Sequence, residues 1–388
     1  MRIELLDGPY TMRGAAPPPP GPAPAGRVAY AAAHVVADPL AGHSPGAPAA
    51  VDWEATLAYR RHLWSYGLRV ADAMDTAQRG AGLDWTAARE LIRRGAEAAR
   101  DHGDPAALLA CGAGTDHAPD AATLAEVEAA YLEQIETVLD TGAGVIIMAS
   151  RALARVARGP DDYHAVYGKL IAHAGRPVVL HWLGEMFDPA LSGYWGSRDV
   201  PTATAHLLAL IREHAPRVEG VKVSLLDEDH ERGLRAALPP GVRLYTGDDF
   251  NYPSLIRSGS HALLGIFDAI APVAAAALRS LDAAEQAADP GERARHLAAY
   301  DDTLAPTVPL ARTLFQAPTY HYKTGIVFLA WLAGHQRAFS MIGGAQSARP
   351  LLHLAALFRL ADQAGLFPDP ELAAHRMRCL LAVHGMRA

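Results

Sequence analysis

Lysine, cysteine and long apolar runs are scarce in this 388-residue chain. Only three of the 35 basic residues are lysines, Lys169, Lys222 and Lys323, so arginine carries nearly all of the positive charge. Two cysteines, Cys111 and Cys379, exclude a disulfide-stabilised scaffold, and neither has the Cys/His spacing of a zinc site. No apolar run has the length of a membrane span, and the N-terminus lacks the apolar stretch of a signal peptide. We therefore expect a cytoplasmic protein.

The charge balance narrows the possible partners. A formal net charge of −7 provides no basic surface for a phosphate backbone, so we expect neither nucleic acid nor a membrane as partner. Hydrophobic residues make up 50% of the chain, which is enough to fill a large core in one or two domains. The composition is that of a globular protein.

Short apolar runs alternate with longer amphipathic segments from residue 27 onward. The segments, such as 84–103 and 121–142, repeat apolar residues near the 3.6-residue period of a helix. Strands that alternate with helices form parallel βαβ units, and eight of them suit a closed (β/α)8 barrel, the TIM-barrel fold. No Gly-x-Gly-x-x-Gly follows the first run, which removes the usual dinucleotide signature of an open sheet. The runs are 27–36, 67–74, 106–114, 144–150, 177–184, 218–224, 242–249 and 261–268.

The two ends of the chain have different patterns. Residues 13–26 are rich in proline, alanine and glycine, which is typical of an extended linker, and residues 1–12 allow a small hairpin or a docked strand. We therefore predict an N-terminal segment with its linker (1–26), a barrel (27–288) and a helical C-terminal region packed on the barrel (289–388). After residue 269 the strand signals stop, and helices are predicted at 270–288, 291–315, 322–340, 346–366 and 370–385.

Polar side chains gather where the predicted strands end. In a (β/α)8 barrel the active site lies at the carboxyl ends of the strands, and few of these residues are needed to hold a barrel together. Their density suggests a polar substrate with several hydroxyl groups. The candidates are His34, Asp38, Asp75, Thr76, Gln78, Thr115, Asp116, His117, Ser150, Arg151, His181, Trp182, Glu185, Lys222, Ser224, Asp248, Asp249 and Asp268.

Lys222 is the most informative candidate, because it interrupts an apolar run that predicts a buried strand. Burial disfavours the ammonium form, and a neutral amine attacks a ketone or aldehyde to form a Schiff base. Arginine stays protonated and has no such chemistry. The alternative is an ion pair with Asp248 or Asp249 on the neighbouring strand, and the residue pattern alone leaves both interpretations open.

Three segments carry a family resemblance. They are GVKVS (220–224), RLYTGDDF (243–250) and GSHALLGIFDAIAPVAAAAL (259–278). In order and spacing they resemble the dihydrodipicolinate synthase / N-acetylneuraminate lyase superfamily of class I aldolases, and the similarity extends over residues 27–385. The resemblance implies that Lys222 forms the Schiff base and that Gly247, Asp248 and Asp249 line the floor of the site. The chain is identified as a member of a divergent, largely uncharacterised branch.

The residues that contact the substrate in that superfamily are changed here. His181 stands at the end of the fifth strand, where the family has a proton-relaying tyrosine; an imidazole with a pKa near neutrality can do the same. The turn MDTAQRG (74–80) replaces the Gly-Thr-Thr-Gly type turn that holds the carboxylate of pyruvate. Thr76 still offers a hydroxyl, but Asp75 would repel a carboxylate and suits sugar hydroxyls better.

Two more positions complete the predicted substrate-binding set. Arg151 stands where a tyrosine is expected after the fourth strand, and Glu185 where an arginine is expected after the fifth. We therefore expect a lysine-dependent aldolase or lyase with Lys222 and His181 as its catalytic residues. It would act on a keto sugar, a keto acid or a related carbonyl compound in carbohydrate catabolism, without a cofactor, as a homo-oligomer (dimer or tetramer).

Other functions stay open at this point. Glu185, His181, Asp248 and Asp268 offer ligands for a divalent metal, as in a sugar isomerase or epimerase on the same barrel. The altered turn after the second strand also suits a binding protein that kept the fold without catalysis. The segment TYHYK (319–323) is expected to have a structural role, either over the barrel mouth or at an interface.

Overall fold

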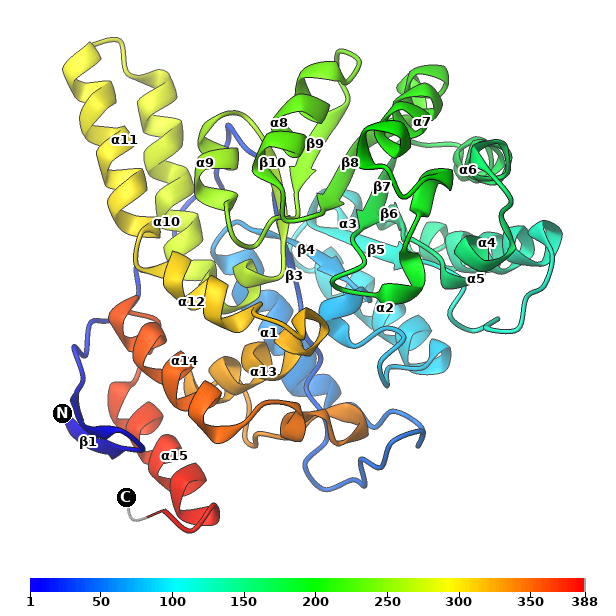
Figure 1. The fold of residues 1–388 in the computed structure, drawn as a ribbon. Coiled ribbons are helices and arrows are strands. Elements are labelled where there is room, and N and C mark those ends of the chain that lie inside the picture. Colours follow the sequence, from blue (N-terminus) through cyan, green and yellow to red (C-terminus); the bar gives the residue numbers. More distant parts are fainter. Residues whose placement is uncertain (387–388) are drawn as a thin grey trace.

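The computed structural model describes residues 1–386 and contains the predicted eight-stranded barrel (Figure 1). Neighbouring strands run parallel, and the first barrel strand pairs with the last, so that the sheet closes. Each strand lies within one of the eight predicted runs. The predicted fold class, a (β/α)8 barrel with a helical C-terminal extension, is therefore confirmed. The strands are β3 (Ala29–Ala32), β4 (Arg69–Asp72), β5 (Leu109–Ala113), β6 (Gly144–Ile147), β7 (Val178–Leu183), β8 (Val218–Ser224), β9 (Arg243–Thr246) and β10 (His261–Leu264).

Aspartate side chains begin many of the helices around the barrel. Asp52, Asp84, Asp104, Asp199 and Asp227 each accept a backbone N–H from the first turn of the helix that follows. Such a cap stabilises a helix by about 1 kcal/mol. The helices of this outer layer are α1 (Trp53–Ser65), α2 (Trp85–Arg100), α3 (Pro105–Leu108), α4 (Leu124–Leu139), α5 (Arg151–Val156), α6 (Pro160–Ala174), α7 (Val200–Glu213), α8 (Glu228–Ala237), α9 (Tyr252–Arg257) and α10 (Ile266–Gln286).

Two tyrosines fill the amino-terminal end of the barrel interior. Tyr30 and Tyr245 are buried, and their ring centroids lie 5.8 Å apart. Gly220 on β8 makes room for them, because a Cβ atom there would lie 2.7 Å from the Tyr245 ring. Alanine, isoleucine, valine and methionine side chains pack above the tyrosines. With this end filled, the carboxyl ends of the strands are the place for a site.

The C-terminal region is helical as predicted, but its helices are shorter. The predicted helix 291–315 is two helices, separated at Pro306, because proline has no N–H to donate and its ring crowds the preceding turn. The predicted helix 346–366 begins only after Pro350, and the predicted helix 322–340 ends before Gly334, whose φ is 91°. The helices are α11 (Pro290–Leu304), α12 (Thr307–Leu314), α13 (Tyr322–Leu332), α14 (Leu351–Gln363) and α15 (Pro370–Val383).

The first residues form the small hairpin that the sequence allowed. Strands β1 (Arg2–Leu5) and β2 (Gly8–Thr11) pair antiparallel, and the hairpin lies beside α15 (Figure 1). The Tyr10 hydroxyl donates to Asp362 on α14 at 2.7 Å. The proline-rich stretch then runs along the barrel without helix or strand, and Asp282 on α10 accepts the Gly26 N–H at 2.8 Å. The N-terminal segment thus ties the C-terminal helices to the barrel.

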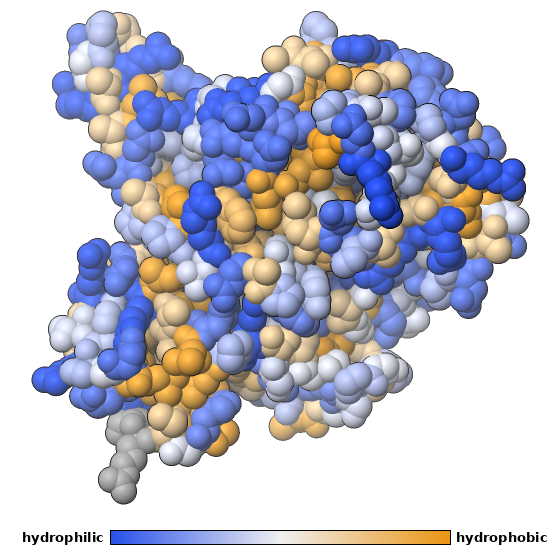
Figure 2. Space-filling model, in the orientation of Figure 1, coloured by the Kyte–Doolittle hydropathy of each residue, from blue (hydrophilic) through white to orange (hydrophobic). Residues whose placement is uncertain are grey.

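The molecular surface is mostly hydrophilic over the outer helices, with apolar residues gathered near the centre of the view (Figure 2). Among residues 1–386, no helix combines the length and the apolar character that crossing a membrane requires.

Candidate active site

Lys222 projects into the carboxyl-terminal end of the barrel. Side chains alternate along a strand, so Gly220, Lys222 and Ser224 share the inward face of β8. The lysine lies in a small chamber that is closed on most sides, and 7% of its surface is exposed. The chamber is lined by Ala32, Met74, Asp75, Thr76, Leu183, Phe187, Lys222, Ser224, Asp249, Gly265 and Tyr322.

Burial, rather than an ion pair, sets the state of this lysine. Among the described residues, no carboxylate forms an ion pair with Lys222, so the direct pair with Asp248 or Asp249 is absent. Burial lowers the pKa of the Lys222 ammonium, and the more distant Asp75 and Asp249 only partly oppose that effect. A lowered pKa increases the fraction of neutral, nucleophilic amine at neutral pH.

Gly247, directly after the neighbouring strand β9, provides the space through which the lysine passes. A Cβ atom at this position would lie 2.9 Å from Lys222 Cε and 2.6 Å from the Val223 carbonyl oxygen. The Gly247 N–H donates to that same carbonyl at 2.7 Å, which fixes the spacing between β8 and the end of β9. The glycine therefore leaves room for the Lys222 side chain, although Gly247 is not itself among the residues that line the chamber.

The two aspartates that follow Gly247 point in different directions. Asp249 is buried in the chamber, where it accepts the Ile266 N–H at 2.8 Å. Burial raises the pKa of Asp249 to about 7, although Lys222 opposes the shift. Asp248 turns away and caps the next turn, accepting the N–H groups of Phe250 and Asn251 at 2.8 and 2.9 Å. Of the predicted pair, only Asp249 lies beside the lysine.

His181 is the second buried polar group of the barrel interior. It lies opposite Lys222 in the register of the adjacent strands β7 and β8. The side chain is fully buried, and neither ring nitrogen has a hydrogen-bond partner among the described residues. Burial and the nearby Lys222 hold the pKa of the imidazole well below its usual range. A neutral imidazole with two free nitrogens is therefore aimed into the site.

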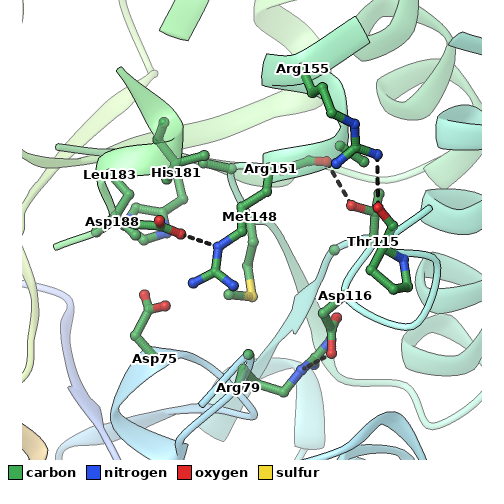
Figure 3. A pocket seen from close by; sticks show the side chains of 17 residues that line it. Asp75, Arg79, Thr115, Asp116, Met148, Arg151, Arg155, His181, Leu183 and Asp188 are labelled. Atoms are coloured by element: carbon green, nitrogen blue, oxygen red, sulfur yellow. Dashed lines mark hydrogen bonds and ion pairs between the residues drawn. The ribbon is translucent and has the colours of Figure 1, made fainter. Parts of the chain in front are cut away.

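His181 lines a cavity of about 280 Å³ that adjoins the lysine chamber (Figure 3). Asp75 and Leu183 line both spaces. Arg151, the first residue of α5, extends into the cavity, and its Nε donates to Asp188 at 2.5 Å. The remaining lining residues are Arg79, Gly80, Gly114, Thr115, Asp116, Pro119, Met148, Ala149, Ser150, Ala152, Arg155 and Leu191.

The turn after β4 places Asp75 between the two spaces. Two non-glycine residues in it, Ala73 and Gln78, have positive φ angles of 51° and 66°. Arg79 supports the turn, because its guanidinium donates to the Ala73 carbonyl at 3.1 Å and is paired with Asp116. Asp75 is half-buried; its backbone carbonyl accepts the Gln78 N–H at 2.9 Å, while its carboxylate accepts no hydrogen bond from the described residues. Its carboxylate is thus free to contact a ligand.

Tyr322 is a residue of the site for which the sequence predicted only a structural role. Tyr322, at the start of α13, lines the lysine chamber, and its hydroxyl lies 2.8 Å from the Thr76 hydroxyl. Burial holds the pKa of the Tyr322 phenol well above its usual range, so the phenol stays protonated. Burial also lowers the pKa of Lys323, while Asp75 and Asp188 oppose this shift. Lys323 lines neither space, and its ammonium group donates to the Tyr320 carbonyl at 3.2 Å.

Glu185 is not brought together with the lysine. It is exposed and lines a separate cavity of about 340 Å³ with Arg198 and Asp227. The geometry therefore does not favour the prediction that Glu185 binds the substrate beside Lys222. The loop after β7 carries Glu185 outward beyond Leu183. Leu183 lines both the cavity beside Glu185 and the cavity beside His181, and it lies between them.

The metal site considered from the sequence does not form. Asp268 accepts the His34 N–H at 2.7 Å and the Tyr59 hydroxyl at 3.0 Å, while Asp248 caps a turn as described above. The four proposed ligands therefore do not converge, and the predicted set is wrong. The cluster of metal-binding type found within residues 1–386 comprises His164 on α6, Glu213 at the end of α7 and His214 directly after it.

Comparisons with known proteins agree with this fold. The solved structure of dihydrodipicolinate synthase from Aquifex aeolicus is 12% identical, with a TM-score of 0.58 over 93% of this chain and 98% of that one. The enzyme from Bacillus clausii is 13% identical, with a TM-score of 0.62 over 87% and 97%. The one from Bacillus anthracis is also 13% identical, with a TM-score of 0.60 over 87% and 97%. The resemblance to dihydrodipicolinate synthases that the sequence indicated is therefore confirmed at the level of the fold.

The sequence itself matches one family. None of the curated proteins compared with the chain matches it. A family model described as "Protein of unknown function (DUF993)" matches residues 9–386, nearly the whole chain. The chain therefore belongs to the DUF993 family, whose fold in this member is that of the dihydrodipicolinate synthases.

Proposed function

We propose that this protein is a lysine-dependent lyase of the class I aldolase type. It acts on a keto sugar, a keto acid or a related carbonyl compound through a Schiff base on Lys222. The observation that carries the proposal is the buried lysine without an ion-pair partner, whose pKa burial lowers, in a chamber at the carboxyl ends of the strands. The likeness in fold to dihydrodipicolinate synthases supports the same reading.

The reaction begins with attack of the Lys222 amine on the substrate carbonyl. Loss of water gives an iminium ion on Lys222, and this cation draws electrons from the adjacent bond. When a hydroxyl stands β to the original carbonyl, its O–H proton passes to a base and the carbon–carbon bond breaks. The products at this stage are an aldehyde and an enamine on Lys222. Protonation of the enamine carbon and addition of water then release a ketone and restore the amine.

His181 is the base that we assign to the β-hydroxyl. Its pKa lies well below the usual range, and not near neutrality as the sequence led us to expect, so near pH 7 the ring is neutral and has a lone pair for the proton but is a weak base. Once protonated, the buried imidazolium is a strong acid and readily returns the proton to the enamine carbon. Its position opposite Lys222 in the adjacent strand puts both steps within one site.

The buried acids balance the charge that the reaction creates. The reactive iminium ion carries a positive charge, and burying an uncompensated cation is unfavourable. Asp75 and Asp249 are the acids whose charges act on the Lys222 amine. Asp249, with a pKa of about 7, is able to ionise when a cation forms beside it. We assign Asp249 to this role and Asp75 to substrate binding.

Borohydride trapping tests the proposal directly. The protein is incubated with a panel of keto sugars, keto acids and pyruvate, then reduced, and the modified peptide is identified by mass spectrometry. We expect a stable adduct on Lys222 that is absent in Lys222→Arg and retained in Lys169→Arg. Lys169 is a suitable control, because it is an exposed lysine paired with Glu128 on the outer helices. If the panel yields no adduct on Lys222, the Schiff-base mechanism is wrong.

A further inference from the structure

The polar groups around the larger cavity fall into two classes. Several are already bonded within the protein: Arg79 binds Asp116, and the Thr115 hydroxyl lies 2.6 Å from that of Ser150. Others have capacity to spare, and these are Asp75, the terminal nitrogens of Arg151, and His181. A ligand gains most from groups that lack partners, so the second class defines what the cavity recognises.

Asp75 and Arg151 face one another across the cavity without touching (Figure 3). The guanidinium is paired with Asp188 through Nε, and no ion pair joins it to Asp75. A group placed between them has to accept from the guanidinium and donate to the carboxylate. A hydroxyl does both with one oxygen atom, whereas a carboxylate or a phosphate offers nothing to Asp75 and is repelled by it.

The position of Asp75 also indicates which carbon atom of the substrate bears the hydroxyl group. Asp75 lines the lysine chamber as well as the cavity, so it stands beside the carbonyl carbon that would be bonded to Lys222. The group nearest to the carboxylate is then the substituent on the carbon next to the carbonyl. The rest of the substrate extends past His181 toward Arg151 in a cavity of about 280 Å³, which suits a small metabolite.

We propose that the substrate is a polyhydroxylated ketone with a hydroxyl on the carbon next to the carbonyl, and not an α-keto acid. Asp75 accepts a hydrogen bond from that first hydroxyl, whose oxygen accepts from Arg151, and the other terminal nitrogen of Arg151 donates to an oxygen farther along the chain. This inference rests on the proposed Schiff-base function, because it uses Lys222 to fix the carbonyl carbon. It names a substrate class for the same site.

Two three-carbon probes separate the hydroxyl from the carboxylate. Hydroxyacetone and pyruvate share a methyl ketone and differ in a CH₂OH group against a carboxylate. In the wild-type protein we expect borohydride trapping on Lys222 to be at least about tenfold faster with hydroxyacetone, a factor that corresponds to about 1.4 kcal/mol. Asp75→Asn keeps the size of the side chain and removes its charge, and we expect it to reduce this preference by about tenfold.

Matched variants control for effects of charge and folding. Asp302→Asn removes the same charge from an exposed position of α11, and we expect it to keep the wild-type preference. Because the Asp75 carboxylate makes no hydrogen bond with the described residues, Asp75→Asn is expected to keep the wild-type melting temperature. Arg151→Gln provides a second variant, which we expect to slow trapping of the ketopentose ribulose more than that of hydroxyacetone.

The outcomes distinguish failure of this inference from failure of the proposed function. Equal or faster trapping of pyruvate on Lys222 overturns the substrate class while keeping the Schiff base. A preference for hydroxyacetone that Asp75→Asn leaves unchanged overturns the role of Asp75. The absence of any adduct on Lys222 with either probe, with ribulose or with the wider panel overturns the Schiff-base function itself.

Discussion

Replacement of Gly247 by alanine is the most direct test of how the chamber is built. The added Cβ would meet Ser224 Oγ at 2.2 Å, the Val223 carbonyl oxygen at 2.6 Å and Lys222 Cε at 2.9 Å. The serine hydroxyl can rotate away, but the carbonyl is held by the Gly247 N–H at 2.7 Å. Relief must therefore come from a wider strand spacing or from movement of the lysine.

Both responses have measurable consequences. Overpacking of this kind lowers the free energy of unfolding by about 1–3 kcal/mol. A shift of the amine by about 1 Å slows a reaction that depends on its position by roughly 100-fold. We therefore expect Gly247→Ala to lower the melting temperature and to slow borohydride trapping on Lys222 by at least about tenfold. Differential scanning calorimetry and mass spectrometry of the reduced protein measure the two effects.

Two other glycines serve as controls. Gly220→Ala creates a comparable clash, with contacts of 2.5 Å to the Arg243 carbonyl and 2.7 Å to the Tyr245 ring, but at the filled end of the barrel. We expect it to destabilise the protein while trapping on Lys222 stays within a few-fold of wild type. Gly233 on α8 has no neighbour within 4 Å, and alanine there is expected to stabilise by about 0.5–1 kcal/mol. Equal loss of trapping in Gly220→Ala and Gly247→Ala would refute the reasoning.

Three further predictions concern the buried polar groups. His181→Asn is expected to keep trapping on Lys222 but to slow carbon–carbon cleavage and deuterium uptake into the released ketone by about 10²–10⁴-fold; unchanged rates would remove His181 from the mechanism. A double-mutant cycle measured by chemical denaturation tests the 2.8 Å hydrogen bond between Tyr322 and Thr76. We expect Tyr322→Phe and Thr76→Val to show a coupling free energy of about 0.5–1.5 kcal/mol, and additive effects would show that the hydrogen bond does not contribute to stability. Glu231 has a pKa raised to about 8 by burial, so the folded state holds a proton that the unfolded state loses above pH 4.5. The free energy of unfolding then falls as pH rises from 4.5 to 8, by up to about 5 kcal/mol from this group. Glu231→Gln should therefore flatten the dependence of melting temperature on pH. If the variant and the wild type show the same dependence on pH, Glu231 is not the group responsible.

The barrel could be predicted because its signals are local and repeated. Eight apolar runs of strand length, separated by amphipathic segments, leave few alternatives to a closed parallel sheet. Lys222 was visible for the same reason, since a charged residue inside an apolar run stands out in a chain with three lysines. The apolar periodicity continues across Pro306 and Pro350 and therefore predicts helices that are too long, although a proline cannot continue a hydrogen-bonded turn and is itself a local signal for the boundary.

Other features depend on contacts between distant parts of the chain. Tyr322 lines the lysine chamber because α13 packs over the barrel mouth, and its hydroxyl lies close to a residue 246 positions away in sequence. Asp248 and Asp249 are adjacent and alike, yet one caps a turn and the other faces Lys222. Neither composition nor periodicity distinguishes such neighbours, since the backbone of the turn decides which carboxylate points inward.

The strained turn after β4 connects these observations. Ala73 and Gln78 adopt left-handed backbone conformations that cost non-glycine residues about 1–2 kcal/mol each. The packing of a barrel does not require this, and a glycine at either position would remove the strain. The strain is maintained by buried contacts: Arg79 holds the Ala73 carbonyl, and the Gln78 amide donates to the Ile342 carbonyl at 3.0 Å. The turn places Asp75 between the lysine chamber and the larger cavity. Strain of this kind persists where function selects it, so its location favours Asp75 as a residue chosen for the substrate rather than one left over from a divergent loop.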